Sequence, residues 1–149
     1  METGQLFLPL LGNWTGLEKQ EASAWAPATT ARASFAFKLD VAGTVVLQDY
    51  RQVRADGAEF LGHGVFLAEP ATERVLWWFF DSSAQPPVPA SGAWHGAELV
   101  CEKVTGEGRA QHRFRPAADR LDYQILVRLG DADTWSPFLT GTYNRISGH

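Results

Sequence analysis

Hydrophobic and polar residues alternate with a period of two along most of this chain. In residues 31–40 the apolar side chains fall on the odd positions, and the charged ones fall on the even positions. Residues 121–129 show the same alternation. A period of two places the two sets on opposite faces of a β-strand. The pattern therefore predicts strands with one face in a core and the other in solvent.

Turn signals separate these segments at intervals of about 10 to 15 residues. Gly43, the sequence Ala55-Asp56-Gly57-Ala58 and the sequence Gly130-Asp131-Ala132-Asp133 are examples. Helix signals are nearly absent beyond the first dozen residues. The predicted strands cover residues 13–23, 31–40, 44–54, 59–68, 74–80, 92–95, 97–104, 109–115, 121–129 and 135–146.

Such a series of antiparallel strands is compatible with a β-sandwich or with an up-and-down barrel. Closure is favoured because no predicted strand has the short or charged character of an exposed edge. We therefore predict an all-β fold: a single closed or nearly closed antiparallel up-and-down β-barrel of about ten strands, with a short N-terminal helical turn. The barrel would form one domain over residues 1–149. A barrel of this size encloses space for a small ligand.

Two segments interrupt the simple alternation. Residues 81–91 are rich in proline and serine, which predicts a loop that lies as a flap near the barrel entrance. Residues 74–80 are apolar on both faces, so the outer row needs cover from the N-terminal segment or from a second subunit. We therefore expect a homodimer through the row formed by Leu76, Trp78 and Phe80. A shorter break is predicted at Trp25-Ala26-Pro27.

Composition and charge narrow the function classes. The chain has 149 residues, of which 45% are hydrophobic and 20% are charged, as in globular proteins. Its net charge of −4 gives no general attraction to nucleic acid or to anionic lipid. Cys101 is the single cysteine, which excludes a disulfide framework and a thiolate metal cluster. The apolar run of residues 6–11 is short and contains a proline, so we expect neither a signal peptide nor a membrane anchor. We therefore expect a cytoplasmic protein without membrane insertion.

Short motifs at both ends of the chain point to a known superfamily. The sequence Gly12-Asn13-Trp14-Thr15-Gly16 opens the first strand, and Tyr143-Asn144-Arg145 lies near the end of the last. With these motifs the chain resembles the calycin superfamily, which includes lipocalins, fatty-acid-binding proteins and avidins. It is most similar to nitrobindin-like domains and to a related bacterial family of unknown function. Further motifs shared with that bacterial family are Gln48-Asp49-Tyr50, Phe60-Leu61-Gly62-His63-Gly64, Trp77-Trp78-Phe79-Phe80-Asp81 and Gly92.

The resemblance implies a role for both terminal motifs. In calycins, a Gly-x-Trp in the first strand packs against a late Arg or Lys and closes one barrel end. Gly12, Trp14 and Arg145 are the matching residues here. An alternative comes from fatty-acid-binding proteins, in which an Arg and a Tyr on a late strand hold a ligand carboxylate. Tyr143 and Arg145 have the required spacing, but in the reversed order.

The histidines give little support for a metal or a cofactor. No His-x-His or His-Glu-x-x-His spacing occurs, so we expect no protein-only metal site. His112 alternates in phase with Phe114 and is the interior histidine, either as a buried neutral imidazole or as a polar anchor for a ligand. The nitrobindin resemblance implies heme, held by a late histidine. The final strand has no histidine and His149 lies at the terminus, so we expect no cofactor.

No nucleophile or phosphate-binding motif is present, and we predict no catalytic residue. One alternative, which the resemblance implies, is a heme-binding nitrobindin-like protein. The others are an isomerase or hydratase that uses His112 with Tyr123, and a dimeric interaction module without ligand. The favoured prediction is a small-molecule-binding barrel for an apolar or amphipathic, lipid-like ligand. Its cavity candidates are Phe35, Phe37, Trp77, Phe79, His112, Phe114, Tyr123, Ile125, Trp135 and Tyr143.

Overall fold

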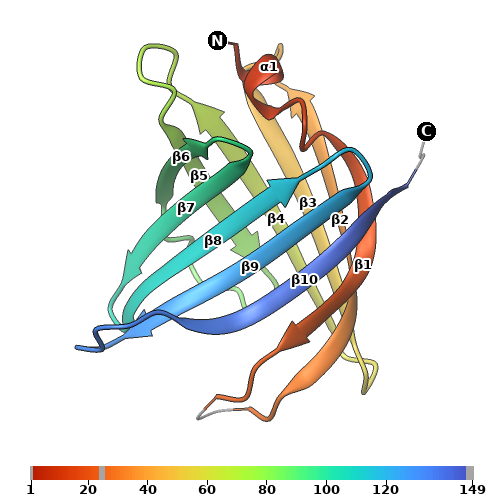
Figure 1. Cartoon of the computed structure of the whole chain (residues 1–149), viewed down its shortest axis with the longest axis vertical. Helices are drawn as coiled ribbons and strands as arrows, with labels where there is room; N and C mark the ends of the chain where they lie inside the picture. Colours follow the sequence, from red (N-terminus) through yellow and green to blue (C-terminus); the bar gives the residue numbers. More distant parts are fainter. Residues whose placement is uncertain (1, 24–25, 147–149) are drawn as a thin grey trace.

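The computed structural model describes residues 2–23 and 26–146, which form a closed barrel of ten antiparallel strands (Figure 1). A short helix, α1 (Thr3–Phe7), precedes the strands. The strands are β1 (Gly12–Gln20), β2 (Thr29–Asp40), β3 (Val45–Arg54), β4 (Glu59–Ala68), β5 (Val75–Asp81), β6 (Ala90–His95), β7 (Glu98–Thr105), β8 (Gly108–Pro116), β9 (Arg120–Leu129) and β10 (Ser136–Ile146). Each strand pairs with its neighbours in sequence, and β1 also pairs with β10. The predicted barrel and its helical turn are confirmed.

The alternating pattern determines which side chains face the interior. On β2 the odd positions from Ala31 to Phe37 are buried, and Arg32 between them is exposed. Because all ten strands alternate about the same axis, their inward side chains meet in one core. Trp25, in the predicted break, and His149 lie outside the described residues. Among the residues described, no helix has the length and apolar character that a membrane crossing requires.

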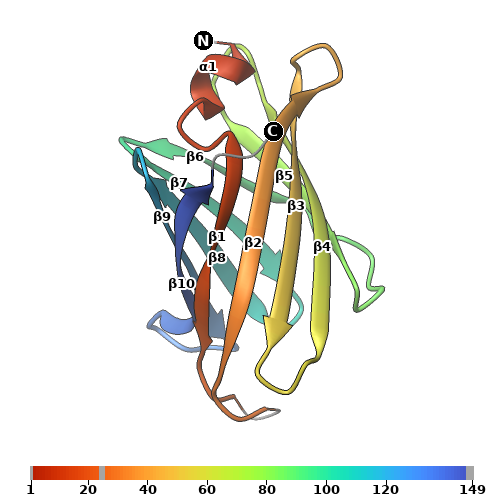
Figure 2. The ribbon, with the colours of Figure 1, turned by 90° about the vertical axis from the view of Figure 1, so that its right-hand side faces the viewer.

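The N-terminal segment closes one end of the barrel. Figure 2 shows α1 above the strands at this end. Phe7, the last residue of the helix, and Leu10, which comes after it, are fully buried, as is Trp14. The Trp14 indole nitrogen donates a hydrogen bond of 2.9 Å to the carbonyl of Leu10, so the polar atom of this large ring has a partner. The segment is therefore a plug, and it does not cover the outer row on β5.

Arg145 on β10 joins the plug to the last strand. Its guanidinium donates to the carbonyl oxygens of Leu11 at 2.6 Å and Pro9 at 3.1 Å. Gly12 has a φ of +120°, and a Cβ there would lie 2.7 Å from an Arg145 nitrogen. Glycine at this position therefore satisfies both the backbone conformation and the close approach of the arginine.

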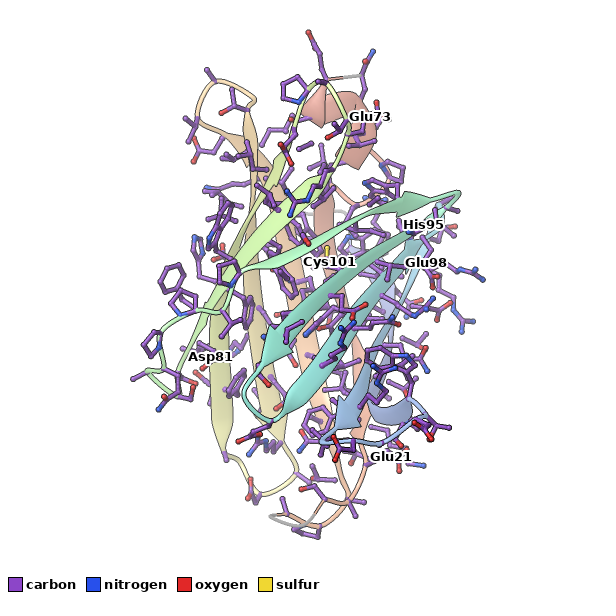
Figure 3. All side chains as sticks on the ribbon, turned by 90° about the vertical axis from the view of Figure 1, so that its left-hand side faces the viewer. Glu21, Glu73, Asp81, His95, Glu98 and Cys101 are labelled. Carbon is purple, nitrogen blue, oxygen red and sulfur yellow. The ribbon has the colours of Figure 1, made fainter. Side chains whose placement is uncertain are left out.

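The barrel wall is incomplete between β5 and β7. β5 pairs with β6 only from Val75 to Trp77, and its remaining residues pair with β4 alone. β6 is short and starts at Ala90, after the 82–89 loop. Figure 3 shows Asp81 at the end of β5, where this loop leaves the barrel. The interior is therefore less covered beside Phe79 and Asp81 than elsewhere along β5.

Candidate functional site

A cavity of about 220 Å³ lies inside the barrel at the end opposite α1. Its surroundings include the last residues of β1, β3 and β5, and the beginnings of β4 and β10. We call its buried side the inner wall, formed by Gln48, Trp77, His112 and Tyr123, and its partly exposed side the rim, formed by Gln20, Arg54, Asp81 and Lys103. The apolar sides between them consist of Phe35, Phe60, Phe79, Ile125, Phe138 and Leu139.

His112 and Tyr123 form one half of the inner wall. They lie on the neighbouring strands β8 and β9, and the His112 Nδ1 is 2.6 Å from the Tyr123 hydroxyl oxygen. Burial, reinforced by the nearby charge of Lys103, lowers the pKa of His112 to about 3. Burial and the charge of Glu18 raise the pKa of Tyr123 well above its usual value. At neutral pH the pair therefore consists of an uncharged imidazole and a protonated phenol.

Gln48 and Trp77 form the other half. The Trp77 indole nitrogen donates a hydrogen bond of 2.9 Å to Gln48 Oε1. An indole N–H can only donate, so this bond fixes the Gln48 amide with its oxygen toward Trp77. Gly64 on β4 makes the arrangement possible, because a Cβ there would lie 2.2 Å from Gln48 Oε1. The Gln48 NH2 group has no partner among the described residues.

The glycines on either side of His63 make room for cavity side chains, whereas His63 itself lies outside the cavity. A Cβ on Gly62 would lie 2.0 Å from the tip of the Phe79 ring. The absence of a side chain at Gly62 therefore lets this ring pack against β4. His63 points outward, and its Nδ1 lies 2.8 Å from an Asp49 carboxyl oxygen. His95 is also exposed. Neither histidine belongs to the cavity.

A buried carboxyl group lies beside the cavity. Glu18 on β1 is 3% exposed, and its Oε1 accepts hydrogen bonds from the Tyr50 hydroxyl at 2.6 Å and from Gln52 Nε2 at 2.7 Å. The Tyr143 hydroxyl donates to Oε2. Burial and the charge of Glu18 raise the pKa of Tyr50 and of Tyr143. Tyr143 is therefore bonded to the carboxyl group of Glu18, and Arg145 is bonded to the carbonyl groups of the N-terminal plug. The two residues do not form a site for a ligand carboxylate.

The rim carries most of the charge around the cavity. Arg54 Nε donates to Gln52 Oε1 at 3.1 Å, which links the rim to the Glu18 cluster. Burial lowers the pKa of Lys103, and the opposing charge of Asp81 partly offsets this effect. Asp81 itself accepts hydrogen bonds from the backbone and hydroxyl of Ser83. Among the described residues, neither Arg54 nor Lys103 forms an ion pair with a carboxylate, although the charge of Asp81 acts on Lys103.

The structure brings six of the ten predicted cavity residues to the cavity: Phe35, Trp77, Phe79, His112, Tyr123 and Ile125. Phe37 and Phe114 are buried nearer the plug, where Phe66 packs against both rings. Trp135 is outside, with the Arg128 guanidinium 5.4 Å from its ring centroid. Because it precedes β10 at a turn, its side chain does not follow the inward alternation of that strand.

Sequence reasoning missed the polar residues of this region, namely Glu18, Gln48, Gln52, Arg54 and Lys103. A signal for two of them, Gln48 and Gln52, was present on β3. Val46, Gln48, Tyr50 and Gln52 alternate in phase and are all buried. Polar residues on the buried face of a strand mark either a satisfied network or a ligand site.

The interior offers no evident metal or thiol chemistry. No group of three or more metal-binding side chains is found in residues 2–23 and 26–146. Burial raises the pKa of Cys101 to about 12, so its thiol stays protonated and unreactive.

A porphyrin is a poor match for this interior. His112 is the one interior histidine among those described, and its Nδ1 is engaged by Tyr123. The cavity of about 220 Å³ is smaller than the pockets of roughly 300–1,000 Å³ that hold drug-sized ligands. The residues present therefore do not fit heme. The absence of a cofactor stays a prediction, which the absorbance spectrum of the protein mixed with hemin would test.

Comparisons with solved structures support the β-barrel fold. No protein-family model matches the chain, and no curated protein matches its sequence. The solved structure of Rv2717c from M. tuberculosis is similar, with a TM-score of 0.76 and 16% identity over 98% of both chains. The S-type phycobiliprotein lyase CPES from Guillardia theta has a TM-score of 0.68 and 10% identity over 100% of this chain and 95% of its own.

A redesigned β-barrel, mFAP1, bound to DFHBI, is a third similar structure. Its TM-score is 0.52 and its identity is 13%, over 94% of this chain and 98% of the designed one. At these identities the three structures support the fold and leave the chemistry to be argued from the site.

Proposed function

We propose that this protein binds a small apolar or amphipathic molecule inside the barrel. The observation that carries the proposal is the cavity of about 220 Å³, which has aromatic sides and a few polar groups at its inner wall. Apolar surface supplies the binding free energy in such sites, and the polar groups fix the orientation of the ligand. Similar barrels include one bound to DFHBI and one named as a phycobiliprotein lyase, which supports a container role.

The size of the cavity favours a short compound over a long lipid. Its volume is below the range of drug-sized ligand pockets, so an extended acyl chain would have to leave through the rim. The rim side chains Arg54, Asp81 and Lys103 are charged, which makes them poor partners for such a chain. We therefore propose a compact ligand with a flat apolar body.

An enzymatic role has less support. A general base works best when its pKa lies near the working pH, whereas the pKa of His112 is about 3. Tyr123 is held in its protonated form, because burial and the charge of Glu18 raise its pKa. The pair is better suited to orienting a ligand by hydrogen bonding than to moving a proton.

Filling the cavity tests the proposal. Ethylbenzene is a suitable probe because it is flat and has no polar group, and NMR chemical shifts report its uptake. Replacing Ile125, which lines the cavity, by Trp should weaken uptake at least about tenfold, a change of about 1.4 kcal/mol. The control Leu126→Trp alters the neighbouring side chain on the opposite face of β9 and should leave uptake within about twofold. Equal uptake by both variants would place binding outside the cavity.

A further inference from the structure

The hydrogen-bond directions at the inner wall indicate what kind of ligand the cavity accepts. Tyr123 has no second hydrogen-bond acceptor among the described residues. We therefore assign its hydroxyl hydrogen to His112 Nδ1, the one acceptor that it reaches among these residues. In the neutral imidazole this leaves the hydrogen on Nε2, so Nε2 is a donor.

The unused groups of both pairs face the cavity. In the described part of the chain, Trp94 Nε1 is the one buried side-chain polar atom without a partner. His112 Nε2 and the Gln48 amide nitrogen also lack protein partners, so they are not enclosed by protein atoms. Both residues line the cavity, so these two nitrogen atoms face the cavity. The inner wall thus offers donors, while its acceptors, Gln48 Oε1 and His112 Nδ1, are already used.

The charges around the cavity also favour a ligand group that accepts hydrogen bonds and is negatively charged. Lys103 pairs with Ala110 and Cys101 pairs with His112, so Lys103 is two residue pairs nearer the rim than His112, on the same face of the sheet. Side chains in such diagonal positions are within reach of one another. The nearby carboxyl group of Glu18 is occupied by Tyr50, Gln52 and Tyr143. A cationic ligand would therefore meet donors at the inner wall and two cations, Arg54 and Lys103, at the rim. The one rim carboxylate, Asp81, already accepts hydrogen bonds from Ser83.

We propose that the ligand is a flat carboxylic acid whose carboxylate accepts hydrogen bonds from His112 Nε2 and the Gln48 amide, with Lys103 as the countercharge. The inference rests on the proposed function and specifies its ligand class. Hydrogen bonds to a charged group are stronger than those between neutral groups, and a carboxylate can accept from both donors at once. The apolar body would lie between Phe79 and Ile125, toward the rim.

Three matched probes test the ligand class: 4-ethylbenzoate, ethylbenzene and 4-ethylbenzylamine, titrated at pH 7 by NMR. We expect the acid to bind at least about tenfold more tightly than ethylbenzene, and the amine to bind most weakly. An acid that binds no better than ethylbenzene, or less well than the amine, would overturn the inference and leave the container function intact. No binding of any probe would overturn both.

Two substitutions locate the carboxylate. Gln48→Glu keeps an oxygen acceptor for Trp77 but replaces the free amide donor by an acceptor. It should weaken 4-ethylbenzoate at least about tenfold and change ethylbenzene binding less than about twofold. Lys103→Met retains the length of the side chain and should also weaken the acid selectively. Lys19→Met, which removes an exposed lysine from the surface of β1, is its control. If Gln48→Glu and Lys103→Met both bind the acid as tightly as the unmodified protein does, the proposed carboxylate position is wrong.

Discussion

Arg145 lies over the indole of Trp14, with its guanidinium carbon 4.1 Å from the ring centroid, and so connects the last strand to the first. The two residues are directly paired in the β1–β10 register. The same guanidinium also donates to three carbonyl oxygens, those of Pro9, Leu11 and Ala118. One side chain thus joins the closure of the sheet to the position of the N-terminal plug.

Arg145→Met should destabilise the fold, because it removes the cation–π contact and all three hydrogen bonds while retaining an apolar stem. Cation–π contacts contribute about 0.5–2 kcal/mol and hydrogen bonds from charged groups about 1.5–3 kcal/mol, and partial exposure reduces both. We expect a loss of roughly 2–3 kcal/mol in the free energy of unfolding, measured by urea denaturation. Arg115→Met, at an exposed position of β8, should change it by less than about 0.5 kcal/mol. Similar losses in the two variants would argue against a closing role for Arg145.

Gly64→Ala should disturb the inner wall of the cavity. The new Cβ would lie 2.2 Å from Gln48 Oε1 and 2.7 Å from Trp77 Nε1, so the hydrogen bond between these two residues must change. Overpacking of this kind costs about 1–3 kcal/mol of stability, which thermal unfolding would reveal. Gly106→Ala is the control, since a Cβ there has no neighbour within 4 Å. An unchanged melting temperature in Gly64→Ala would mean that the wall can move aside.

The stability of the protein should fall as the pH drops below about 6.5, in part because of His112. Its pKa is about 3 in the folded protein, against the usual value of about 6.5 after unfolding. Between these values the unfolded state binds a proton that the folded state does not, so stability rises with pH by up to about 1.4 kcal/mol per unit. Urea denaturation between pH 7 and pH 4 would show this slope. His112→Gln, which keeps an acceptor for Tyr123, should flatten it, and an unchanged slope would assign the effect to other groups.

Much of the fold could be predicted because the alternation of side chains is strong. β2 shows it over most of its length and β9 departs from it at Leu126, and turn signals such as Gly57 and Gly130 separate the strands. Both glycines have positive φ angles, which is the physical reason that glycine marks these turns. Alternation also placed His112 and Tyr123 on the interior faces of their strands. Their hydrogen bond follows from the β8–β9 register.

The polar half of the site was less predictable, because it depends on which side chains meet across the barrel. Glu18 and Tyr143 are 125 positions apart in sequence, and nothing local indicates that one holds the other. The two glycines of Gly62-His63-Gly64 are a further example. In the structure, the space over these glycines is filled by Phe79 and by the Gln48–Trp77 pair. These side chains come from the neighbouring strands β3 and β5, and no local pattern around the glycines indicates them.

The outer row on β5 leads to a last prediction. Leu76 and Trp78 are partly buried, and Phe80 is 51% exposed, with Val65 and Leu67 of β4 beside them. Apolar side chains gathered on one outer face favour association, and the homodimer through this row stays a prediction. Sedimentation velocity over a range of concentrations should show a dimer that Phe80→Glu dissociates, because the new charge would be buried at the contact. Leu129→Glu, at an exposed apolar position of β9, should leave the dimer intact. A protein that is monomeric at every concentration would show that the row is simply solvated.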